Sequence, residues 1–251
     1  MLLALTTAFA LSQSYRTVAA IMAPLLQADF GLSAQALGVF AGAFHFAFGA
    51  LQLFMGIGID LHGVRRTVLC AFPLAIVGAV LSALSTSFAM LVAGQVLVGI
   101  GCAPAFLVCT VFIARRFAAD RFASVSGLTL GIGSIGMLLT GTPLAWLVEA
   151  ESWRAGFWAL AAASTLAWAL IFWRVHEPAT PSPPVKISVW RALRSYGALF
   201  GLPHTLGIVA LACVTYAAFI TLRGLWLGPL LIERHGFSLV QSGNVAVIVS
   251  V

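Results

Sequence analysis

The stretch GIGIDLHGVRR, residues 56–66, lies between two long apolar segments of the chain. The segment before it begins near Ser33, and the segment after it carries no charged residue as far as Ala114. Gly63 allows the chain to reverse direction over a short distance, and the two arginines that follow favour the anionic face of a lipid bilayer. The stretch therefore predicts a short polar loop between two membrane-spanning helices.

The composition of the whole chain agrees with this prediction. Of its 251 residues, 61% are hydrophobic and 8% are charged, whereas an ordinary soluble domain is about 45–50% apolar and about 25% charged. So few charges could not cover the surface of a soluble protein of this size. The composition excludes a soluble globular enzyme, a disordered chain and a nucleic-acid-binding protein, despite the net charge of +6. It indicates a multi-pass membrane protein embedded in the lipid bilayer.

A membrane-spanning helix needs about 20 mostly apolar residues, and charges and helix-breaking residues divide the chain accordingly. The charge-free segment 67–114 is too long for one span, and Ser85-Thr86-Ser87 is the expected turn within it. The expected fold is all-α, with a six-helix bundle over 1–174, a linker over 175–202 and the start of a second bundle over 203–251. The expected helices span about 3–28, 33–57, two within 67–114, then 122–148, 156–173 and 203–232, and an eighth begins near 239.

Basic residues are distributed unequally between the two sides of this topology. The loops after the second, fourth and sixth helices carry nine of them, and the loops on the other side carry two. Because cytoplasmic loops are enriched in Lys and Arg, the N-terminus and the linker are expected in the cytoplasm. The preference for Arg over Lys, with abundant Ala and Gly, favours a bacterial source and hence the inner (plasma) membrane. The nine residues are Arg65, Arg66, Arg115, Arg116, Arg121, Arg174, Lys186, Arg191 and Arg194.

A short internal repeat recurs at an offset of 205 residues. Pro24-Leu25-Leu26 is followed by Gly31 and Ser33 between the first and second helices, and Pro229-Leu230-Leu231 is followed by Gly236 and Ser238 between the seventh and eighth. Glycine permits the turn, and serine can cap the helix that follows. The repeat predicts a transporter built from two parallel six-helix halves. Such a protein would have roughly 410 residues, so the chain is expected to lack most of the second half.

The loop quoted above resembles the G-x-x-x-D-x-x-G-x-R-R signature of the major facilitator superfamily. Gly56, Asp60, Gly63, Arg65 and Arg66 occupy its defined positions. The resemblance implies a secondary active transporter that works by alternating access, in which this loop acts as a conformational switch between the two halves. The alternative is that the loop only retains its positive charge on the cytoplasmic side.

Charged residues inside the expected spans are candidate site residues, because a buried Arg costs at least about 2.5 kcal/mol. Arg16 lies near the middle of the first helix. Its spacing to Pro24 resembles the Tyr-x-Asp-Arg…Pro stretch in the first helix of the organic-anion symporter branch, with Tyr15 where that branch has Asp. The resemblance implies that Arg16 binds an anionic solute. Gln13 lies on the same helical face as Arg16 by its spacing, and Gln13 and Tyr15 are further candidates for solute binding.

Arg223 in the seventh helix lies at a comparable position of the second half, and the two arginines could hold one anion from both sides. Alternatively, each arginine pairs with main-chain carbonyls, or Arg223 reaches the outer interface. In the second helix, Gln52 is a further candidate for solute binding. His45 is a candidate for proton coupling, because it is the mid-span group that titrates near neutral pH.

These features favour a transporter of a small anionic, organic acid-like solute. The expected spans contain no carboxylate, which counts against an exporter of lipophilic cations. A drug or multidrug efflux transporter of the same fold remains an alternative, as does a truncated membrane protein that does not transport. Enzyme and nucleotide-binding motifs are absent from the sequence. We therefore expect no enzyme activity, no cofactor and no metal, and a monomer when the protein is full length.

Overall fold

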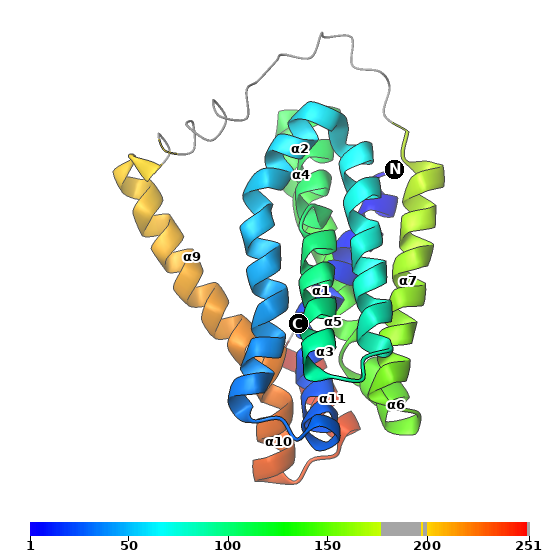
Figure 1. Cartoon of the computed structure of the whole chain (residues 1–251). Helices are drawn as coiled ribbons and strands as arrows, with labels where there is room; N and C mark the ends of the chain where they lie inside the picture. Colours follow the sequence, from blue (N-terminus) through cyan, green and yellow to red (C-terminus); the bar gives the residue numbers. More distant parts are fainter. Residues whose placement is uncertain (177–196, 198–199, 250–251) are drawn as a thin grey trace.

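The computed structural model describes residues 1–176, 197 and 200–249, and within them the regular secondary structure is entirely helical. The predicted all-α fold is confirmed. Most of the predicted linker over 175–202 lies outside the described residues. The first part of the chain forms a single bundle (Figure 1). Its helices are α1 (Leu2–Phe30), α2 (Ala34–Ala83), α3 (Phe88–Cys102), α4 (Ala105–Arg116), α5 (Ala119–Leu139), α6 (Thr142–Ala150) and α7 (Trp153–Arg174).

The part of the chain after the linker forms one long interrupted helix and the start of another. The interrupted helix consists of α9 (Pro203–Thr221), the π-helical turn η1 (Leu222–Trp226) and α10 (Leu227–His235). The next helix is α11 (Leu239–Val249). Figure 1 shows α9 leaning away from the bundle where it begins, whereas α10 and α11 lie against the bundle. Accordingly, Ile220 is the buried residue of α9, and Leu227, Gly228 and Pro229 of α10 are all buried.

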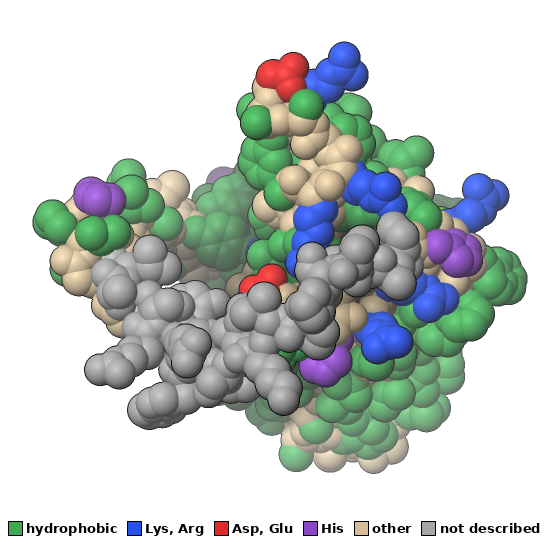
Figure 2. All heavy atoms as spheres, turned by 90° about the horizontal axis from the view of Figure 1, so that it is seen from above, with side chains coloured by type: hydrophobic (Ala, Val, Ile, Leu, Met, Phe, Trp, Pro, Cys, Tyr) green, Lys and Arg blue, Asp and Glu red, His purple; other side chains and the backbone are tan. Residues whose placement is uncertain are grey.

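The bundle has two ends with different charge. We call the end with the Gly63 turn and the last residue of α7 the linker end, and the end with the turns at Gly31 and 84–87 the opposite end. Figure 2 shows Lys and Arg side chains spread over the linker-end face. The turns of the opposite end instead carry most of the acidic residues. The arginines described at the linker end are Arg65, Arg66, Arg115, Arg116, Arg121 and Arg174.

Six helices of the described chain are long and apolar enough to cross a membrane: 34–52, 54–83, 88–116, 119–150, 153–174 and 203–221. The helix α1 is not among them although it has 29 residues. Its central segment from Ser12 to Thr17 is polar, and this polarity suits a helix that is enclosed by others. More than half of its residues are buried.

Three glycines take a left-handed backbone conformation, and they are the three turn glycines that the sequence singled out. Gly31 and Gly236 have φ of 61° and 67° and end α1 and α10. Gly63 has φ of 83° and ψ of 169°. Ser33 and Ser238 accept hydrogen bonds at 3.2 and 3.1 Å from the main-chain N–H three residues later. The two copies of the repeat therefore share their turn geometry as well as their residues.

Some helix boundaries differ from the sequence expectation. The reversal expected in the loop over 56–66 occurs at Gly63, the one residue of α2 with non-helical φ and ψ, so α2 consists of two helices joined there. The turn is therefore shorter than the expected loop. The fifth expected helix, 122–148, is broken after Leu139. There Gly141 precedes Pro143, which lacks a main-chain N–H and favours the first turn of a new helix. The turn expected at 85–87 is confirmed, and Ser87 caps α3.

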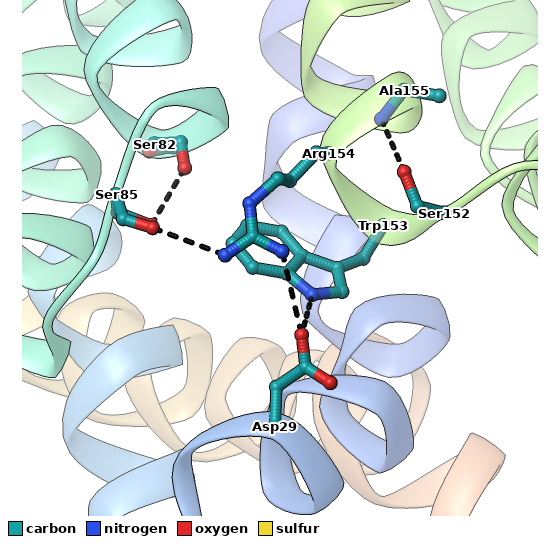
Figure 3. A network of polar contacts seen from close by, with 7 residues as sticks. All are labelled: Asp29, Ser82, Ser85, Ser152, Trp153, Arg154 and Ala155. Atoms are coloured by element: carbon teal, nitrogen blue, oxygen red, sulfur yellow. Dashed lines mark hydrogen bonds and ion pairs between the residues drawn. The ribbon is translucent and has the colours of Figure 1, made fainter.

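A polar network joins three turns at the opposite end (Figure 3). The carboxylate of Asp29, at the end of α1, accepts a hydrogen bond from Nε1 of Trp153 at 2.7 Å and pairs with Arg154 at 3.4 Å. The same Arg154 donates to the main-chain oxygen of Ser85 at 3.3 Å and stacks on Trp153. This network ties α1 and the 84–87 turn to the start of α7, so the bundle is held together where its loops are short.

Candidate functional site

Arg16 is the centre of the candidate site, and it is positioned by an enclosed helix. Its guanidinium carbon lies 4.3 Å from the centroid of the Phe48 ring on α2. Its Nη1 donates a hydrogen bond to the hydroxyl of Tyr216 on α9, which belongs to the second part of the chain. Its Nε is buried and has no hydrogen-bond partner within the described residues. A buried donor without a partner is costly, so this N–H is available to a ligand.

A stripe on α2 faces this arginine. His45, Phe48 and Gln52 follow one another at spacings of three and four residues, which places them on one side of the helix. His45 donates from Nδ1 to the carbonyl of Ala41 at 2.9 Å, because a carbonyl can only accept. Its Nε2 and the Oε1 of Gln52 are buried without partners among the described residues. Arg16 stacks on the middle member of the stripe and lies within electrostatic range of His45.

The neighbours of Arg16 along α1 hold the helix in place. The hydroxyl of Tyr15 lies 2.9 Å from Oγ of Ser164 on α7, and both residues are buried. Thr17 makes a hydrogen bond of 2.7 Å with Thr140 at the end of α5. The structure therefore directs Tyr15 toward α7 and not toward the stripe on α2. Gln13 is half-buried on the turn of α1 that precedes Arg16.

Close contact between main chains fixes α1 further. A Cβ built on Gly136 of α5 would overlap the carbonyl oxygen of Ala10, and one built on Gly228 of α10 would overlap that of Ala20. The hydroxyl of Ser14 donates to the carbonyl of Gly136 at 2.8 Å. Small residues let helices approach this closely inside membranes. The guanidinium of Arg16 is thus carried by a helix held from α5, α7 and α10.

Arg223 lies elsewhere. It is fully buried in the π-helical turn η1, and its Nη2 donates to the carbonyl of Met137 near the end of α5 at 3.1 Å. It follows Tyr216 by seven residues, which is about 10 Å along a helix. The contact with a main-chain carbonyl is of the kind that the alternative interpretation expected, and the binding of one anion by both arginines stays a prediction.

The residues of the signature loop contact helices of their own bundle. Asp60 lies 3.7 Å from Arg115 at the end of α4, and both side chains are largely exposed. Arg65 donates to the carbonyl of Phe172 near the end of α7 at 3.1 Å, and its guanidinium lies over the Phe172 ring. A cation beside the last carbonyls of a helix is favourable. Arg66 is exposed, and Gly56 is half-buried about two helical turns before Gly63.

Two residues that contact Arg16, Phe48 and Tyr216, were not among the residues predicted from the sequence. Spacing places both on helices that carry candidate residues, but it does not show which neighbouring helix each side chain contacts. Phe48 lies between the candidates His45 and Gln52 on the same helix face, and Tyr216 lies two helical turns before Arg223. Aromatic residues are common in apolar helices, so nothing in their type distinguished them from packing residues.

Comparisons with known proteins agree with this architecture. The family model described as Major Facilitator Superfamily matches residues 4–251. A structure of a bacterial homologue of the lysosomal transporter Spinster, in an inward-facing and unoccupied conformation, is 20% identical with a TM-score of 0.71, covering 98% of this chain and 59% of that one. A D-xylose-proton symporter is 17% identical with a TM-score of 0.64, covering 99% and 65%. Both likenesses concern the fold alone.

Two curated relatives are similar in sequence. The "Hexuronate transporter" of Bacillus subtilis is 22% identical over 93% of this chain and 56% of that protein. The "Probable sulfoacetate transporter SauU" of Cupriavidus necator is 27% identical over 61% of this chain and 35% of that protein. The chain thus matches about half the length of the hexuronate transporter, and a smaller share of the sulfoacetate transporter. The family match, the helical bundle and the signature loop lead to one conclusion: this chain is a multi-pass membrane protein of the major facilitator superfamily.

Proposed function

We propose that this chain is part of a secondary active transporter for a small organic anion, which binds at Arg16 between the two halves. The observation that carries the proposal is the buried, unpartnered Nε of Arg16 in the centre of an enclosed helix. A guanidinium binds carboxylates through two parallel hydrogen bonds. In apolar surroundings an arginine is retained at a cost, and anion binding would account for its presence.

The names of the two curated relatives support the same class of solute. Hexuronate carries a carboxylate, and sulfoacetate carries a sulfonate and a carboxylate. The contact between Arg16 on α1 and Tyr216 on α9 supports a site that both halves share. In the proposed transporter the halves 1–174 and 203 onward move relative to each other as a monomer, with the linker 175–202 between them.

Uptake by the full-length gene product in proteoliposomes tests this function. Candidate carboxylates and sulfonates would be supplied as labelled solutes, and Arg16→Ala would be compared with the wild-type protein. Loss of one partner of a buried charge pair costs about 2–5 kcal/mol, so we expect uptake to fall by about 30-fold or more. Arg121→Ala is the matched control, because Arg121 is exposed at the start of α5. Equal uptake by Arg16→Ala and Arg121→Ala would contradict the proposed role of Arg16.

The loop over 56–66 is proposed to act as the conformational switch. In this state Asp60 and Arg65 contact α4 and α7, and movement of the halves would exchange these contacts for others. The linker end, with its concentration of arginines, is proposed to face the cytoplasm of a bacterial cell together with the N-terminus.

A further inference from the structure

Three buried polar atoms without partners belong to Arg16 and to the stripe on α2 that it contacts. These are Nε of Arg16, Oε1 of Gln52 and Nε2 of His45. Phe48 lies between the last two on α2, and Arg16 stacks on its ring at 4.3 Å. Each atom is buried away from solvent and is unsatisfied within the described part of the chain, and each such atom is unfavourable until a ligand or a water pairs with it.

The three atoms differ in hydrogen-bonding chemistry, and the difference indicates which ligand groups could pair with them. Nε of Arg16 can only donate and carries positive charge. Oε1 of Gln52 is a neutral acceptor, and its amide also offers N–H donors. Nε2 of His45 accepts when the ring is neutral, because Nδ1 keeps its hydrogen toward the carbonyl of Ala41. A bare carboxylate would satisfy Arg16 but would leave a neutral acceptor without a donor.

A hydroxyl group suits these neutral positions because it both donates and accepts. We infer that the site selects an anion that carries at least one hydroxyl group, with the anionic oxygens on Arg16 and a hydroxyl on Gln52, and with His45 as its second neighbour. This inference rests on the proposed function and narrows the class of its solute. Phe48 supports the guanidinium and covers the apolar part of the solute between the two polar contacts.

Binding of three probes to the full-length protein tests the inference. Gluconate and hexanoate are six-carbon monocarboxylates that differ in their hydroxyl groups, and glucose is hydroxylated but neutral. We expect gluconate to bind about tenfold more tightly than hexanoate in calorimetric titrations, because one ordinary hydrogen bond can supply that difference in affinity. Glucose should bind weakly, because it lacks the charge that Arg16 requires.

Substitution of Gln52 tests whether this residue distinguishes gluconate from hexanoate. Gln52→Met keeps the length of the side chain and removes both polar groups, so the ratio between gluconate and hexanoate should fall to within about twofold while hexanoate binds as before. Gln35→Met is the matched control, since Gln35 is exposed in the first turn of α2, and it should keep the ratio of the wild-type protein. Thermal unfolding of both variants verifies that they are folded.

Failure of the inference and failure of the proposed function look different. Equal affinity for gluconate and hexanoate, or an unchanged ratio in Gln52→Met, would overturn the selection of hydroxylated anions and leave an anion transporter. Tight binding of glucose with weak binding of both anions would overturn the anion site itself. A protein that binds none of the three probes would contradict both proposals.

Discussion

At the scale of single residues, Arg16 places its guanidinium over the ring of Phe48 and donates a hydrogen bond to the hydroxyl of Tyr216. An arginine in the middle of an apolar helix is costly, and this cost is visible in the sequence. Its surroundings are not visible there, because they come from α2 and α9, which lie about 30 and 200 residues further along the chain. The stacking on Phe48 and the contact with Tyr216 depend on how the helices pack, and spacing within one helix carries no such information.

Tyr216 gives the first prediction. Its hydroxyl accepts a hydrogen bond from Nη1 of Arg16, and a bound carboxylate would use the same nitrogen. Tyr216→Phe removes the hydrogen bond that an anion must displace, so we expect anion affinity to rise by about three- to tenfold. Isothermal titration of the full-length protein measures this change. Tyr15→Phe is the control, because its hydroxyl is bound to Ser164; it should lower thermal stability and keep anion affinity. Weaker binding by Tyr216→Phe would mean that the hydroxyl contacts the solute.

His45 gives a second prediction at this scale, concerning proton coupling. Protonation of Nε2 would place a second positive charge near Arg16, so anion binding should strengthen at acidic pH, where the ring takes up a proton. His45→Gln cannot take up the proton and should bind the anion with little dependence on pH. His204 is exposed at the start of α9, and His204→Gln is the control. A pH dependence that persists in His45→Gln would assign coupling to another group.

At the scale of elements, the turns were more predictable than the helix interiors. Gly31, Gly63 and Gly236 are the described residues with positive φ, and each follows from the need for a turn that a side chain would oppose. The break between α5 and α6 and the π-helical turn at Arg223 were not predicted. The break follows the local chemistry of Gly141 and Pro143 and lies beside the contact of Thr140 with Thr17, and the π-helical turn lies where Arg223 contacts Met137. Hydrophobic patterning cannot locate such tertiary contacts.

Gly63 supplies the prediction for this scale. With φ of 83° and ψ of 169° it holds a conformation that L side chains rarely adopt, so Gly63→Ala should destabilise the turn by about 1–3 kcal/mol. The expected result is a thermal midpoint lower by several degrees, measured on purified protein in detergent. Gly58 lies in the same loop, where a Cβ would meet the side chain of Thr67 at an ordinary 3.7 Å. Gly58→Ala should therefore unfold at or above the wild-type temperature, and equal losses in both variants would contradict the argument.

At the scale of the whole molecule, the two parts of the chain meet mainly at the opposite end. There α11 packs on α6: the hydroxyl of Thr142 donates to Oδ1 of Asn244 at 2.5 Å. A Cβ on Gly141 would lie 2.5 Å from Cγ2 of Val247 and 3.0 Å from the carbonyl oxygen of Gly243. At the linker end α9 leans away from the bundle (Figure 1). The contact at the opposite end therefore depends on two glycines that leave no room for a side chain.

In the proposed transporter, alternating access requires this contact to form and to separate in each cycle, which leads to the last prediction. Gly141→Val would force α11 away from α6 and hold the opposite end open, so uptake should fall by about tenfold or more while the bundle stays folded. Ala162→Leu adds the same number of carbon atoms at an exposed position of α7 and should transport normally. In proteins with Cys70 and Cys213 replaced by serine, an impermeant maleimide should label Asn244→Cys faster when Gly141→Val is also present. Unchanged labelling would show that α11 and α6 accommodate the added side chain without separating. Closure of this end would then depend on other residues.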